Sequence, residues 1–246
     1  MKLILLFISI VIPITGDDIA RSIESTKAPQ DIKSTLSMLI IDSKGREKNK
    51  KIKTVSKDRS RMQILWLLEP ARDKGISLLK IDYSDKPDEM RMWIPAIKKL
   101  RRISTNKQSG SFMGSDLSYE DLYNKNLSDF IYLYKNDQLV NGIDCYVVEI
   151  VPRDGTVTDY GKHISWISKE DFYTLKEESF SKSDIKYKEK VFTYIKSNGY
   201  NVISSISVKN LSKGSSTILT FHDIQVDTNI ADGLFHEKNL RRVIND

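Results

Sequence analysis

The chain has 246 residues, of which 39% are hydrophobic and 29% are charged, and its formal net charge is +6. This composition is typical of a water-soluble globular protein and excludes a chain that is disordered or embedded in a membrane throughout. The length suits a single domain, because β-rich domains often exceed about 200 residues.

Residues 1–16 have the layout of a signal peptide: Lys2, an apolar run over 3–12, then Pro13 and Gly16. The run is shorter than the ~20 residues that a membrane-spanning helix needs. No cysteine directly follows it to carry a lipid, and the single Cys145 is expected in the core. We expect cleavage after Gly16 and a periplasmic domain over 17–246; the alternative is a buried N-terminal strand.

After the apolar run, Ile19 and Ile23 have the spacing of one helical face, and Asp17 or Asp18 is expected to cap that helix. From residue 33 onward the apolar period shifts toward two, and turn residues separate at least eleven strand-like segments. Few helical patterns interrupt them, which argues against a parallel sheet with crossover helices. The pattern predicts a mainly β (α+β) fold, a strongly curved antiparallel sheet or incomplete β-barrel covered by short helices.

One stretch, residues 109–127, breaks the strand pattern. Gly110 and Gly114 flank Phe112 and Met113, and Ser118 with an acid three residues later predicts a short helix from Tyr119 to Lys125. The flanked pair is expected to form an adaptable apolar cover over an opening. The alternative is an ordinary crossover whose Phe and Met side chains pack in the core.

The sequence shows no metal-ligand spacing among its three histidines, no phosphate-binding glycine loop and no GxSxG nucleophile motif, so no metal or cofactor is expected. The acids of the Glu177-Glu178 pair are expected on the surface. A lipid-directed serine hydrolase using Ser115, Asp116 and a distant histidine stays open as a minor alternative, although an enzyme is not expected.

Several short segments match a known family in order. They are Leu67-Leu-Glu-Pro70, Gly75-Ile-Ser-Leu-Leu79, Met92-Trp-Ile-Pro95, Lys99-Leu-Arg-Arg102 and, most specifically, Ser111-Phe-Met-Gly-Ser-Asp-Leu-Ser-Tyr-Glu-Asp-Leu122. The chain resembles the LolA-like outer-membrane lipoprotein-sorting proteins, which often accompany RND-type permeases. Ser115, Leu117 and Leu67 depart from the residues usual at these positions.

The resemblance implies a periplasmic carrier of acyl chains, from lipoproteins or phospholipids, between inner and outer membranes. Strand alternation places Leu65 with Leu67, and Met92 with Ile94, on shared faces. The residues expected to line or cover the acyl-chain cavity are Leu65, Leu67, Leu79, Met92, Ile94, Phe112, Met113, Leu117, Tyr119 and Leu122.

The basic run of Lys98, Lys99, Arg101 and Arg102 is expected to dock on anionic lipid headgroups or on an acidic partner surface. Nucleic acid is not an expected partner outside the cytoplasm. Two alternatives remain open for this run: a solvated face without a partner, and an accessory protein that docks on a permease or the envelope without carrying lipid.

Overall fold

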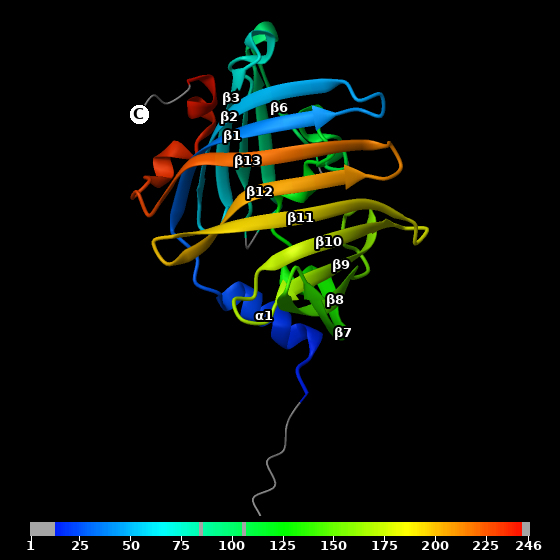
Figure 1. Cartoon of the computed structure of the whole chain (residues 1–246). Coiled ribbons are helices and arrows are strands. Elements are labelled where there is room, and N and C mark those ends of the chain that lie inside the picture. Colours follow the sequence, from blue (N-terminus) through cyan, green and yellow to red (C-terminus); the bar gives the residue numbers. More distant parts are fainter. Residues whose placement is uncertain (1–12, 84–85, 105–106, 243–246) are drawn as a thin grey trace, which may run out of the picture.

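The computed structural model describes residues 13–83, 86–104 and 107–242. Within them, thirteen strands form one antiparallel sheet in the order β6-β5-β4-β3-β2-β1-β13-β12-β11-β10-β9-β8-β7 (Figure 1). The strands are β1 Asp31–Ile41, β2 Glu47–Lys57, β3 Met62–Glu69, β4 Ser77–Ile81, β5 Glu89–Ile94, β6 Lys99–Arg102, β7 Phe130–Val140, β8 Ile143–Pro152, β9 Tyr160–Ser168, β10 Thr174–Ser181, β11 Lys186–Ser197, β12 Tyr200–Asn210 and β13 Ser215–Val226.

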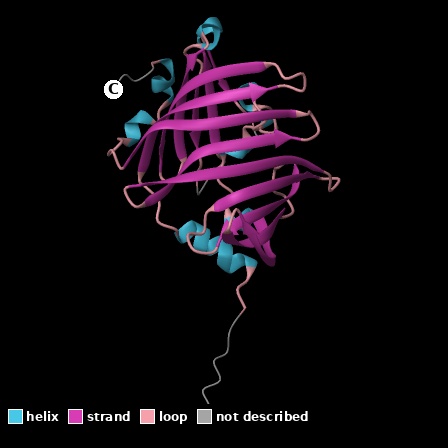
Figure 2. Ribbon diagram, in the orientation of Figure 1, coloured by secondary structure: helices cyan, strands magenta, loops and turns pink. Residues whose placement is uncertain are grey.

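Helical segments are few and short (Figure 2). The α-helix α1 covers Gly16–Ser25, and 3-10 turns include η1 Ala71–Asp73, η2 Pro95–Ile97, η4 Phe112–Gly114, η5 Glu120–Leu122, η6 Leu127–Asp129, η7 Asp232–Leu234 and η8 Glu237–Arg241. In the described part of the chain, no helix combines the length and the apolar character needed to cross a membrane. The predicted fold class is confirmed.

The sheet is curved and open, with β6 and β7 as its two edges. These edge strands are consecutive in the sequence, so the segment between them must pass from one edge of the sheet to the other. Every other pair of consecutive strands lies side by side in the sheet. The single long connection therefore bridges the open side of the sheet, which is where the sequence predicts a cover.

The concave face of the sheet is apolar on the side of β1 to β5. In β1, the alternating residues Leu36, Met38 and Ile40 are buried, as one face of a strand requires. They share one cluster with Met90 of β5 and Val208 of β12. Strands β5 and β12 are six positions apart in the sheet, so only strong curvature brings their side chains into one cluster.

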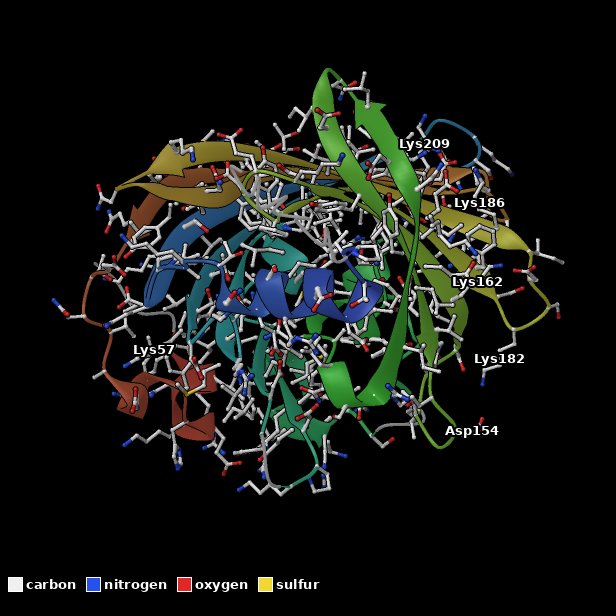
Figure 3. All side chains as sticks on the ribbon, turned by 90° about the horizontal axis from the view of Figure 1, so that it is seen from below. Lys57, Asp154, Lys162, Lys182, Lys186 and Lys209 are labelled. Atoms are coloured by element: carbon white, nitrogen blue, oxygen red, sulfur yellow. The ribbon has the colours of Figure 1, made fainter. Side chains whose placement is uncertain are left out.

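Helix α1 packs at the other end of the sheet, where Ile19 and Ala20 contact a cluster that includes Tyr132 of β7. Seen from below, α1 lies across the opening of the curved sheet (Figure 3). The N-cap is Thr15, whose hydroxyl accepts a hydrogen bond from the Asp18 backbone at 3.2 Å. The expected cap at Asp17 or Asp18 is wrong, because Asp18 supplies the reciprocal half of this capping box.

The expected signal peptide lies outside the described residues up to position 12, so its cleavage after Gly16 stays a prediction. Ile14 packs against the cluster under α1, and Thr15 caps the helix. Cleavage after Gly16 would remove both contacts.

The convex face of β2 to β5 is covered by the C-terminal segment of η7 and η8. Phe235 and Leu240 pack against Ile64, Trp66 and Leu79 there. The Trp66 indole donates a hydrogen bond to the Asn239 carbonyl at 3.1 Å. Leu79 therefore lies on the opposite face from Leu65 and Leu67, which corrects its expected orientation. Its neighbour Leu78 takes the concave position instead.

Candidate functional site

Residues 109–125, named the cover segment from here on, lie against the concave face of the sheet. Phe112 is 1% exposed and Leu117 is 6% exposed, and both belong to the apolar cluster of the concave face. The other expected cover residues, which are Met113, Tyr119 and Leu122, pack against the same cluster. The cover segment therefore fills the apolar interior of the curved sheet.

The expected wall residues are placed on both faces of the sheet. Leu65 and Leu67 are buried in the concave cluster, and Met92 packs against it. Ile94 is half-buried and follows Met92 by two positions in β5. Of the expected wall, only Leu79 faces the C-terminal segment. Contact of the remaining residues with a ligand stays a prediction.

The cover segment is a compact loop with its own hydrogen bonds. The Phe112 backbone N–H donates to the Leu117 carbonyl at 2.7 Å, and the Tyr119 N–H donates to the Gly110 carbonyl at 3.0 Å. Phe112 and Tyr119 also make an edge-on ring contact with centroids 5.8 Å apart. Met113 has a left-handed backbone, with φ of 51°. The two glycines therefore bracket a folded loop.

The helix predicted over Tyr119–Lys125 is wrong in length, since only the single 3-10 turn Glu120–Leu122 forms. The acid in the predicted capping box does act locally, because the Ser118 N–H and hydroxyl both donate to Asp121 Oδ2, at 2.8 and 2.9 Å. Tyr123 then adopts an extended backbone and ends the turn. The Asp121 side chain is buried against the sheet, and the helix does not continue beyond this turn.

Two polar contacts attach the cover segment to the apolar side of the sheet. The Asp116 carboxylate accepts hydrogen bonds from Ser215 and Thr217 of β13, at 2.6 and 2.8 Å. The ammonium of Lys80 on β4, a residue only 1% exposed, donates to the Leu122 carbonyl at 2.7 Å and to Asp82 at 3.0 Å. Strands on both sides of the concave face thus hold the loop.

The third attachment is a buried ionic cluster at strands β9 to β11. Asp121, whose side chain is 2% exposed, accepts a hydrogen bond from Lys188 at 2.8 Å and one from Lys190. The Tyr160 hydroxyl donates to the same carboxylate at 2.9 Å. The full set, named the charged cluster from here on, comprises Asp121, Lys125, Tyr160, His163, Glu177, Lys188 and Lys190.

Glu177 is the second acid of the charged cluster. It accepts hydrogen bonds from Lys190 at 3.0 Å and from Lys125 at 2.8 Å. Burial opposes ionisation of both acids, but the facing ammonium groups hold the pKa values of Asp121 and Glu177 well below the ordinary range. Both acids are therefore charged at neutral pH.

Two members of the cluster, His163 and Tyr160, are neutral at neutral pH. Burial lowers the pKa of His163 to about 3, and its ring nitrogen Nδ1 lies 3.0 Å from the Ser179 hydroxyl. Burial also raises the pKa of Tyr160 well above its ordinary value. Burial lowers the pKa of Lys188, and the facing Asp121 carboxylate opposes that shift. With its three lysines protonated, the cluster has three ammonium groups and two carboxylates, which leaves one positive charge in excess.

Two cavities of about 130 Å³ each flank the charged cluster. One is lined by Lys190, His163 and Lys125, and the other by Lys188, Tyr187 and Ser118, while Tyr160 borders both. Each has room for several water molecules or a small polar group.

The side chains considered for a serine hydrolase are engaged elsewhere. The Ser115 hydroxyl donates to the Phe112 carbonyl at 2.7 Å, and Asp116 binds β13. His163 contacts the Ser179 hydroxyl and the Glu177 carboxylate, His222 contacts the Ser37 hydroxyl, and His236 accepts a hydrogen bond from the Lys238 backbone. The structure does not bring a Ser-His-Asp arrangement together among these described residues. It also shows no group of three potential metal ligands within the described part of the chain.

The expected basic docking patch lies at the edge of the sheet. Lys99, Arg101 and Arg102 belong to β6 and Lys98 ends the preceding turn, and the side chains of all four are exposed. Ile97, in the same turn, is 46% exposed. The structure thus gathers the predicted charges at one edge, next to an exposed apolar residue. What binds there stays a prediction.

Comparison with solved structures defines the class of the fold. An outer membrane lipoprotein-sorting protein domain from Vibrio parahaemolyticus matches with a TM-score of 0.86 and 24% identity, covering 92% of this chain and 98% of that one. A LolA superfamily protein from Nitrosomonas europaea matches with a TM-score of 0.73 and 19% identity, covering 92% and 100%. The fold is LolA-like, as the sequence resemblance implies.

A DUF1329 family protein from Desulfovibrio piger matches with a TM-score of 0.84 and 28% identity, covering 92% of this chain and 97% of that one. A family model described as "Uncharacterized protein" matches residues 59–242, more than half of the chain, and the chain belongs to that family. No curated protein matches the sequence.

Proposed function

We propose that this protein is a non-enzymatic periplasmic carrier that holds acyl chains of lipoproteins or phospholipids between the concave sheet and the cover segment. A single domain over 17–246, exported by a signal peptide over 1–16, performs this role. The proposal rests mainly on one observation, which is that apolar side chains of the cover segment fill the concave face of the sheet. The LolA-like fold supports the same reading.

The energetics of the cover suit exchange with a lipid. Burying an acyl chain stabilises it by about 0.8 kcal/mol for each CH₂ group, and burying a large apolar side chain contributes about 1.5–3 kcal/mol. One acyl chain therefore offsets the loss of contacts from Phe112 and Leu117. A closed empty state and an open loaded state then differ by a small free energy, as a carrier that must also release its ligand requires.

The basic edge supplies the contact with membranes in this proposal. Lys98, Lys99, Arg101 and Arg102 are exposed and follow the exposed Ile97 in the chain, so cations can meet anionic headgroups while an apolar side chain enters the interface. An RND-type permease is proposed as the partner from which lipid is received or to which it is delivered.

The same patch favours the second candidate, an accessory protein that docks without carrying lipid. Docking alone would be supported if the protein contains no bound lipid but binds anionic vesicles. Its affinity for the vesicles should then fall with added salt and with charge reversal at Lys99 and Arg101. The carrier function would be supported if the charge-reversal variant loses vesicle binding but still retains lipid, because the patch lies outside the apolar cluster.

The proposal is tested by mass spectrometry of lipid extracted from protein that has been purified from the periplasm under mild conditions. A carrier is expected to retain acyl lipid in stoichiometric amounts, without turnover. Replacing Leu67, in the wall of the concave face, by Glu should abolish retention. Wild-type protein that never contains or takes up acyl lipid would contradict the proposal, and so would turnover of ester substrates that is lost in Ser115→Ala.

A further inference from the structure

We infer that Lys188, Lys190 and the Tyr160 hydroxyl form an anion site for the phosphate of a phospholipid headgroup, which Asp121 of the cover segment occupies in the closed state. This inference rests on the proposed carrier function and names the class of its ligand. It concerns the polar side of the concave face, for which no role has been assigned above.

The geometry is that of an anion held by three convergent donors. Lys188 and Lys190 are alternate residues of β11, so their side chains leave the same face of the sheet, and they are 3% and 5% exposed. Tyr160 comes from β9, and its hydroxyl also accepts a hydrogen bond from Lys188. All three donors belong to the sheet, whereas the carboxylate between them belongs to the cover segment.

Opening of the cover removes the carboxylate that accepts hydrogen bonds from Lys188, Lys190 and Tyr160. A buried ammonium group without a counter-ion is strongly unfavourable. If the cover leaves with Asp121 and Lys125, the net charge of the remaining residues does not change, and Glu177 still pairs with Lys190. Lys188, however, loses the carboxylate that binds it. A phosphodiester carries one negative charge and several acceptor oxygens, so it can accept the hydrogen bonds that Asp121 accepts in the closed state.

The donors adjoin the apolar cluster, as an amphiphile requires. Lys190 is the cross-strand partner of Val208, a fully buried member of that cluster. In the cover segment, Asp121 directly precedes Leu122, which packs on the same cluster. The loop therefore presents a carboxylate beside an apolar side chain, the arrangement that a lipid headgroup and its acyl chain would reproduce.

Space for a headgroup is present beside the donors. The two cavities of about 130 Å³ reach Lys188 on one side and Lys190 on the other. Three more acids, Asp116, Glu120 and Asp159, line the cavity beside Lys188. Glu120 belongs to the cover segment, so opening of the cover removes it together with Asp121.

An anion site at Lys188 and Lys190 would distinguish phospholipids from neutral acyl lipids. A neutral diacylglyceryl group fills the apolar cluster but leaves Lys188 without an anionic partner, whereas Lys190 keeps Glu177. We therefore expect a phosphate-bearing lipid to bind more tightly than a neutral lipid with the same acyl chain, by about tenfold to a hundredfold, the usual range for hydrogen bonds to a charged group.

The test uses lauroyl lysophosphatidylglycerol and monolauroylglycerol, which share an acyl chain and differ in the phosphate-bearing headgroup. Their dissociation constants are measured by titration calorimetry, below micelle-forming concentrations, for three full-length mature proteins. These are the wild type, Asp121→Asn, and the double variant Lys188→Met/Asp121→Leu, which keeps the net charge of the charged cluster unchanged.

The wild type should prefer the phosphate lipid, Asp121→Asn should increase that preference, and the double variant should bind both lipids with similar affinity. If Asp121→Asn fails to fold, the wild type and the double variant decide the question. Equal binding of both lipids by the wild type, or a preference unchanged in the double variant, would overturn the anion site and leave the carrier function standing. Binding of neither lipid by the wild type would contradict the carrier function itself.

Discussion

Lys188 donates a hydrogen bond of 2.8 Å to Asp121, and the two side chains are only 4% and 2% exposed. The pair joins a strand of the sheet to the loop that covers it, so the ionic contact and closure of the concave face are coupled. Buried ion pairs are sensitive to loss of one partner, because the other is left charged in a medium that solvates it poorly.

Asp121→Asn should therefore lower the free energy of unfolding by about 3–5 kcal/mol, the usual cost of breaking a buried pair. The matched control is Asp232→Asn, which removes the partner of Lys57 in a pair whose acid side chain is 75% exposed. That change should cost about 1 kcal/mol or less. Urea denaturation measures the free energy of unfolding of both variants. Equal decreases would show that burial of the Asp121 pair does not increase its contribution to stability.

Stability should decrease on acidification from about pH 6.5, before the carboxylates titrate. The pKa of His163 is about 3 in the folded protein and 6.5 ordinarily, so between these values the unfolded chain binds a proton that the folded chain does not. The expected slope is about 1.4 kcal/mol per pH unit. Glu177, whose pKa is lowered from 4.5, adds to the loss only at lower pH.

The slope between pH 6.5 and 4.5 is measured by urea denaturation at several pH values. His163→Asn should flatten it, whereas the exposed His236→Asn should leave it unchanged. A slope that persists in His163→Asn would assign the effect to other groups.

Truncating the tip of the cover, Phe112→Ala/Met113→Ala, should speed exchange of a fluorescent acyl probe. Their loss weakens contacts between the loop and the apolar cluster, and a loop can open locally without unfolding the sheet. Melting temperature should change only modestly. Leu79→Ala is the control, since Leu79 packs on the convex face and its truncation should cost about 2–5 kcal/mol without faster exchange. If the double variant melts at a far lower temperature but exchanges the probe at the wild-type rate, Phe112 and Met113 are ordinary core residues and not a cover.

The fold and the apolar side of the site were predictable from local patterns. Alternation in β1 places Leu36, Met38 and Ile40 on one face, and the glycines around Phe112 mark the interruption in the strands. These signals depend only on neighbours in the sequence. Which face of each strand is concave depends on curvature and strand order, so Leu79 was assigned to the wrong face.

The charged side of the site was missed for a similar reason. In β11, Val191 is 43% exposed while Lys188 and Lys190 are buried, which reverses the usual preference of these residue types. Glu177, expected on the surface, is 5% exposed and ion-paired. The alternate lysines of β11, of which Lys190 pairs with Glu177 of β10, were the available signal, but only the position of the cover segment shows that this face is inside.

The most direct test of the central claim is hydrogen–deuterium exchange of the cover segment, with and without a bound acyl lipid. The account predicts that lipid raises exchange at the backbone amides of Phe112 and Tyr119, whose hydrogen bonds fold the loop, while amides of β1 to β3 stay protected. Stoichiometric lipid binding with the cover amides as protected as in the empty protein would contradict it, because the acyl chain would then lie somewhere other than under the cover.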